Sequence, residues 1–61
     1  MTELVRQVEQ DIADTERHLT FWRHQQEVQA GTDLAEQTRR IVTGYGLQLK
    51  ELQKARKLFD A

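Results

Sequence analysis

Ala30-Gly31-Thr32-Asp33, near the middle of the chain, is the stretch that decides the fold. Gly31 suits the left-handed residue just beyond a helix end, because glycine has no side chain to clash there. Asp33, with Glu36 three residues later, is typical of a capping pair that opens a helix. The stretch therefore predicts a turn over about residues 31–33, between a helix over about residues 3–30 and a helix over about residues 34–59.

The outer ends of the two predicted helices carry matching signals. Thr2 can cap the first helix, with Glu3 in its first turn. Basic residues crowd the last turns of the second helix, as the helix dipole favours: Lys50, Lys54, Arg56 and Lys57.

Apolar residues recur at alternating steps of three and four along both helices, the spacing of a heptad seam. In the first helix the seam runs through Met1, Val5, Val8, Ile12, Thr15, Leu19 and Trp22, and continues with Gln26 and Gln29. In the second it runs through Leu34, Thr38, Ile41, Tyr45, Gln48, Leu52, Ala55 and Phe59, and Val42 and Leu49 widen it on one side. The wide stripe predicts two neighbouring helices rather than one.

Folding the chain back at Gly31 gives an all-α antiparallel hairpin and a defined set of layers. We expect Trp22 beside Ile41 and Val42, Leu19 beside Tyr45, Ile12 beside Leu52, and Val5 beside Phe59. The predicted core and oligomer interface is Val5, Val8, Ile12, Leu19, Trp22, Leu34, Ile41, Val42, Tyr45, Leu49, Leu52 and Phe59.

The chain of 61 residues forms a single helical-hairpin domain, residues 1–61, without cysteine or proline. Domains this small usually need a disulfide, a metal or a partner to be stable, and without cysteine the partner is favoured. We therefore expect a homodimer that forms a four-helix bundle. A higher oligomer, or docking on another protein, meets the same requirement. The absence of cysteine and of a long apolar run predicts a cytoplasmic protein that neither spans a membrane nor is exported.

Charge is divided between the two halves of the chain. Residues 1–30 carry three basic and six acidic side chains, and residues 31–61 carry six basic and four acidic ones. The hairpin places the acidic start of one helix beside the basic end of the other. Arg23 and Arg56 fall within the apolar stripes, where we expect them to pair with Glu16, Glu9 or a carboxylate of a second copy. A formal net charge of -1 argues against a dedicated nucleic-acid binder.

Gly44 and Gly46 stand inside the second predicted helix, where two glycines together cost about 2 kcal/mol relative to alanine. One interpretation is structural: close packing that leaves room for Trp22 or its symmetry mate, or a kink. The other is a hinge, or a notch that receives a partner.

Some residues outside the seams are candidates for a partner surface. Phe21 and Val28 stand seven residues apart on the first helix, flanked by Arg17 and His24. Leu47 and Leu58 stand outside the seam of the second helix. The candidate partner surface is therefore Arg17, Phe21, His24, Val28, Leu47 and Leu58. The alternative is incidental exposure, and Leu47 and Leu58 could equally cover a flank of the bundle.

Catalytic and metal sites are not expected. His18 and His24 stand six residues apart, which does not place them on one helical face, so we expect no metal and no cofactor. The chain has neither serine nor cysteine, and a thin bundle has no deep pocket, so we expect no enzyme.

A resemblance supports the hairpin. The chain resembles a group of short bacterial helical-hairpin proteins of unknown function over residues 16–59. The residues that carry the likeness are Glu16-Arg17-His18, Gln26, Gly31-Thr32-Asp33-Leu34-Ala35, Ile41-Val42, Leu49, Leu52 and Arg56. In length and turn position the layout is also similar to the Rop-type RNA-binding four-helix dimer, without a shared residue motif.

Two functions are compatible with this pattern. The first is a non-enzymatic adaptor, small regulator or assembly subunit that acts as a homo-oligomeric bundle. The alternative is a Rop-like RNA-binding regulator, which would use Arg6, Arg17, Phe21, His24 and Gln25 on the outer face of the first helix.

Overall fold

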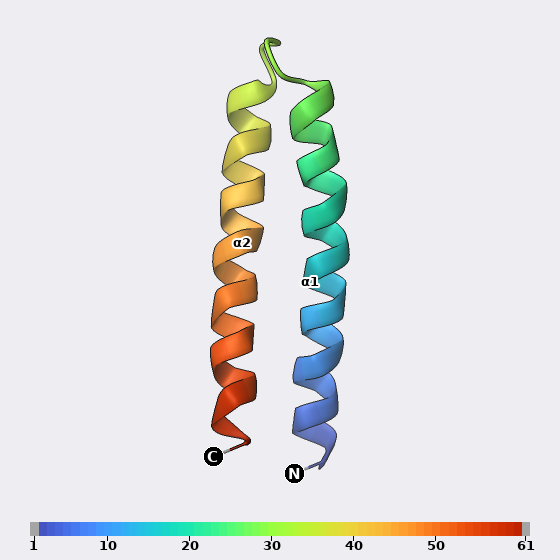
Figure 1. Cartoon of the computed structure of the whole chain (residues 1–61), viewed down its shortest axis with the longest axis vertical. Coiled ribbons are helices and arrows are strands. Elements are labelled where there is room, and N and C mark those ends of the chain that lie inside the picture. The colour runs from blue at the N-terminus through green and yellow to red at the C-terminus, as the bar shows by residue number, and fades with distance from the viewer. Residues whose placement is uncertain (1, 61) are drawn as a thin grey trace.

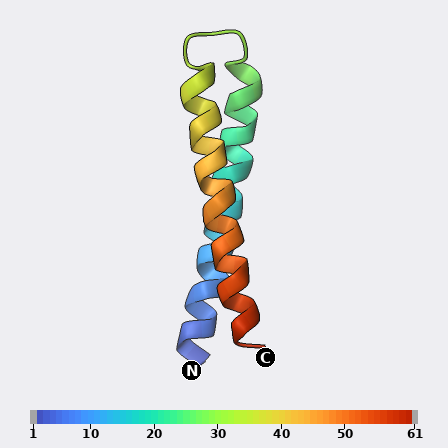
Figure 2. The same ribbon diagram turned by 90° about the vertical axis from the view of Figure 1, so that its left-hand side faces the viewer.

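The computed structural model describes residues 2–60, and side chains from residue 3 onward. It is all-helical, with α1 over Thr2–Val28 and α2 over Ala35–Leu58. The two helices run antiparallel and side by side, and both chain ends lie opposite the turn (Figures 1 and 2). The predicted helical hairpin is confirmed. Met1 and the cap expected from the Thr2 side chain lie outside the described part.

The turn between the helices is wider than the sequence indicates, because α1 ends at Val28 and α2 begins at Ala35. Gly31 adopts φ +83°, the left-handed conformation expected of it. The amide of Thr32 then donates to the carbonyl oxygen of Gln29 at 3.0 Å. The glycine thus reverses the chain within six residues.

The capping role expected of Asp33 and Glu36 is wrong. Leu34 occupies the position before α2, and no side chain bonds to the helix there as a cap. The hydroxyl of Thr32 takes over part of this role: it donates to the carbonyl oxygen of Gln29 at 2.6 Å and accepts from the amide of Leu34 at 3.3 Å. The backbone of Leu34 already has helical angles. The side chain that bonds to the backbone before α2 is therefore Thr32, one residue earlier than the expected Asp33.

The carboxyl end of α2 follows the prediction. Arg56 and Lys57 occupy the last turn, where cationic side chains interact favourably with the helix dipole. The amide of Phe59 donates to the carbonyl oxygen of Arg56 at 3.2 Å and closes this end.

The hairpin is a thin ribbon with almost no interior. Its Cα atoms extend over 46 × 14 × 11 Å. The radius of gyration is 14.2 Å, whereas a compact domain of this length has about 10.5 Å. Figure 1 shows the broad side of the ribbon and Figure 2 its narrow side. Each helix therefore has one neighbour and leaves most of its circumference open.

Replacement of Gly31 tests the turn. Gly31→Ala places a Cβ in the left-handed region and should lower the free energy of unfolding by about 1 kcal/mol, or about 4–8 °C in melting temperature. Circular dichroism during thermal unfolding measures this. Gly46→Ala is the control, because Gly46 lies within α2 and alanine favours helix there. An unchanged melting temperature for Gly31→Ala would contradict the role of the left-handed turn.

Acidification tests the start of α2. Arg39 donates to both carboxylate oxygens of Glu36 at 3.0 and 3.1 Å, and these bonds hold the pKa of Glu36 below its ordinary value of 4.5. A carboxyl group with a lowered pKa stabilises the fold above its ordinary pKa, and this contribution is lost as the pH falls through the folded-state pKa.

We therefore expect a smaller drop in melting temperature between about pH 7 and about pH 3 in Glu36→Gln than in the wild type. The difference is small, because the pair is exposed. Glu51→Gln, which removes a carboxylate elsewhere on α2, is the control. Equal drops in the wild type and Glu36→Gln would refute the contribution.

Candidate interaction surface

The seam between the helices encloses few side chains. Among residues 3–60, Leu19 is the only buried apolar residue, at 4% exposure, and it is accompanied by two buried threonines, Thr15 and Thr38. The hydroxyl of Thr38 on α2 donates to the side-chain oxygen of Gln29, the first residue of the turn, and lies 2.9 Å from the carbonyl oxygen of Leu34. The heptad spacing runs through both threonines, but sequence reasoning assigned them no role.

Most of the predicted core residues are only partly covered. Leu34 is 49% exposed and Phe59 is 38% exposed, because Leu34 lies in the turn and Phe59 follows the last turn of α2. The others, apart from Leu19, are half-buried: Val5, Val8, Ile12, Trp22, Ile41, Val42, Tyr45, Leu49 and Leu52. A single hairpin therefore leaves the predicted core open to solvent on at least one side.

One edge of the seam is polar. Arg56 reaches Glu9 on α1 with an N···O distance of 3.1 Å, and Asp60, just beyond the end of α2, at 2.8 Å. The hydrogen bond to Asp60, with the charges of both carboxylates, raises the pKa of Arg56 further above its ordinary value. The pairing of Arg56 with Glu9 was expected from the sequence and is confirmed, whereas Arg23 is exposed.

The opposite edge is aromatic. The ring of His18 stacks on Tyr45 with centroids 5.4 Å apart and planes 5° apart. Its Nδ1 donates to the carbonyl oxygen of Asp14 at 2.8 Å. Phe21 meets Trp22 edge-on at 5.3 Å. His18 thus covers the ring of Tyr45, a contact that the sequence spacing did not predict.

A hollow opens beside these rings. It has a volume of about 470 Å³ and is lined by Trp22, Ile41, Gly44, Tyr45 and Gln48; we call it the Gly44 hollow. A Cβ built on Gly44 or on Gly46 would meet nothing within 4 Å, and α2 continues through both glycines. Close approach of Trp22 in the same chain, one of the interpretations drawn from the sequence, therefore does not explain Gly44.

Helical spacing assigns the strongly exposed apolar side chains of both helices to the flank that carries the Gly44 hollow, because Phe21 stands three residues after His18 and Leu47 three residues after Gly44. Residues seven apart share a side of a packed helix. Leu4 precedes His18 by two heptads, and Leu58 follows Gly44 by two heptads. We call this flank the aromatic face; its large exposed apolar residues are Leu4, Phe21, Val28, Leu47 and Leu58, with exposures from 54% to 77%.

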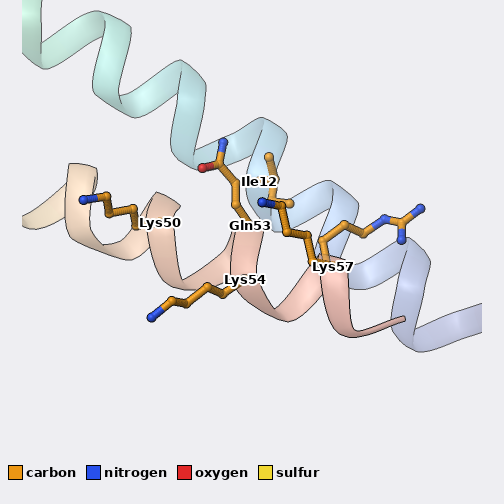
Figure 3. A pocket seen from close by; sticks show the side chains of 6 residues that line it. Ile12, Lys50, Gln53, Lys54 and Lys57 are labelled. Carbon is orange, nitrogen blue, oxygen red and sulfur yellow. The ribbon is translucent and has the colours of Figure 1, made fainter. Parts of the chain in front are cut away.

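A second hollow, of about 430 Å³, is cationic. Figure 3 shows Gln53 and Lys57 of α2 extending toward Ile12 of α1, whereas Lys50 and Lys54 point away from it. Arg56 also lines the hollow, but Glu9 and Asp60 bind its guanidinium. Acidic α1 and basic α2 thus meet at this end of the hairpin, as the charge division predicted.

The remaining candidates lie on the outside of α1. Arg17 and His24 are exposed, and the guanidinium of Arg17 pairs with Asp14. Within residues 2–60 the structure contains neither a cluster of three or more potential metal ligands nor a helix with the length and apolar character needed to cross a membrane.

Comparison with models of protein families, with curated proteins and with solved structures finds no match to this chain.

Substitution of Thr38 tests the polar bond between α2 and the turn. Thr38→Val keeps the shape but removes the hydroxyl that bonds to Gln29, and should lower the free energy of unfolding by about 1 kcal/mol. Urea unfolding followed by circular dichroism measures this. Thr43→Val, at an exposed position of α2, is the matched control and should be nearly neutral. Equal effects of the two substitutions would show that the bond contributes nothing.

Proposed function

We propose that this protein is a non-enzymatic structural or regulatory protein that acts as a homo-oligomeric helical bundle. The observation that carries the proposal is the burial of a single apolar side chain, Leu19, among residues 3–60. Burying a leucine contributes about 1.5–3 kcal/mol, which falls far below the conformational entropy of ordering two long helices. The remaining half-buried seam residues gain their full burial only when further helices cover them.

The arrangement of charges supports a protein that works by contact rather than by catalysis. Ionic groups pair locally, as Arg39 does with Glu36 and Arg17 with Asp14. The two hollows described above are open, and neither is lined by a carboxylate that could act together with a base. An adaptor, small regulator or assembly subunit needs no more than a stable surface of defined shape.

RNA binding is the second candidate function. Phe21 is 55% exposed on α1 and is free on one side to stack on a base, and exposed Arg17 and His24 lie near it in sequence. The ion pair of Arg17 with Asp14 and the net charge of -1 weigh against strong phosphate binding. Gel-shift assays with structured RNA at low salt separate the two functions, because retardation would favour RNA binding and its absence would remove this candidate.

Light scattering across a concentration series tests self-association directly. We expect a molar mass near twice 7.2 kDa. On dilution, the helicity measured by circular dichroism should persist down to the same concentration as the dimer mass. A molar mass at a higher multiple of 7.2 kDa would support the homo-oligomeric function with a different number of chains. A folded monomer at all concentrations would contradict the proposal.

A further inference from the structure

The hairpin exposes more surface than a chain of its mass should. Its accessible surface is 4990 Å², whereas a compact monomer of 7.2 kDa exposes about 4,100 Å². The excess of about 900 Å² is close to the roughly 800 Å² that each partner contributes to a stable protein interface. One further contact of ordinary size would therefore bring the chain to the surface area of a compact protein.

The two broad faces of the ribbon differ in their suitability for that contact. One face carries the ion pair of Glu9 with Arg56, and the cationic hollow opens near this pair. The aromatic face carries the large exposed apolar side chains and the Gly44 hollow. Because burial of apolar area drives association, the aromatic face is the one that gains most from being covered.

The register of the hairpin fixes which residues lie at the same height. Glu9 meets Arg56, His18 meets Tyr45 and Gln29 meets Thr38. It follows that Phe21 of α1 lies level with Gly44 of α2. Phe21 projects from the aromatic face, and Gly44 is the residue in the Gly44 hollow that has no side chain.

The aromatic face is therefore complementary to itself. Rotation by a half turn about an axis parallel to the helices places α1 of one hairpin over α2 of the other, at unchanged height. Each Phe21 then faces the partner's Gly44. Asp11 comes level with the oppositely charged Lys54, while Asp14, which would face Glu51, already binds Arg17.

We propose that the aromatic face binds a second copy of the chain about this two-fold axis, with Phe21 of each hairpin seated in the Gly44 hollow of the other. The inference rests on the proposed homo-oligomeric function and adds its surface, its contact and its geometry. Both turns lie at the same end of the resulting four-helix bundle. No contact within the hairpin requires a glycine at position 44. The proposed dimer explains Gly44, because a residue without a side chain leaves room for the ring of the partner's Phe21.

Filling the hollow tests the contact. In light scattering, Gly44→Leu should reduce the molar mass from about twice 7.2 kDa to 7.2 kDa, because the leucine occupies the place of the partner's ring. Thr43→Leu is the matched control. It places a leucine at the exposed position directly before Gly44 and should leave the mass unchanged. Phe21→Ala should also give the monomer mass.

The double variant Phe21→Ala with Gly44→Leu guards against simple misfolding. Its leucine fills the space that the partner's ring has left, so the dimer mass should return. A variant that had merely failed to fold would not be rescued in this way. Wild-type monomers would overturn the proposed function and this inference together. A wild-type dimer that persists in both single variants would overturn the inference alone.

Cross-linking tests the direction of the two hairpins. The chain has no cysteine, so Asp33→Cys introduces a single thiol at an exposed position of the turn. A short bismaleimide should then join two chains into a covalent dimer under native conditions and not in denaturant. A native dimer by light scattering that gives no covalent product would overturn the arrangement with both turns at one end.

Discussion

Two helices in contact share a single seam, and a single seam surrounds very few side chains. This constraint governs the rest of the molecule. Leu19 and two threonines are buried, and the residues before and after them along the seam remain half-covered. A third and a fourth helix would convert these half-covered positions into a core without any change in the hairpin itself. The proposed homo-oligomeric bundle would complete this half-covered seam.

Within that constraint, polar contacts do more to fix alignment than to stabilise. Glu9 and Arg56 hold the open end of the hairpin in register, and Gln29 and Thr38 hold the end near the turn. Ion pairs at the surface contribute little to stability, so the pair of Glu9 with Arg56 mainly selects one sliding position of α2 along α1. Because the register sets which residues share a height, it also decides what any partner of the hairpin meets.

The sequence was sufficient for the hairpin but not for the details of its surface. Periodic spacing predicted both helices, and Gly31 predicted the turn, because helices and turns depend on local backbone geometry. The cap at Asp33 failed because Thr32 bonds to the backbone on both sides of the turn, a choice that depends on how the chain reverses in space. The stack of His18 on Tyr45 and the empty space beside Gly44 depend on side-chain directions across two helices, which spacing within one helix does not determine.

The order in which the hairpin assembles follows from the position of its turn. Gln29 and Thr38 are separated by 9 residues along the chain, and Glu9 and Arg56 by 47. Closing the longer loop first would cost about 1.5 kcal/mol more in chain entropy than closing the shorter one. Loop-closure entropy alone therefore favours a folding order in which the contacts near Gly31 form before the open end closes. In the reverse direction, the open end frays first, so exchange of backbone amides with solvent should be fastest at the ends of α1 and α2 farthest from the turn.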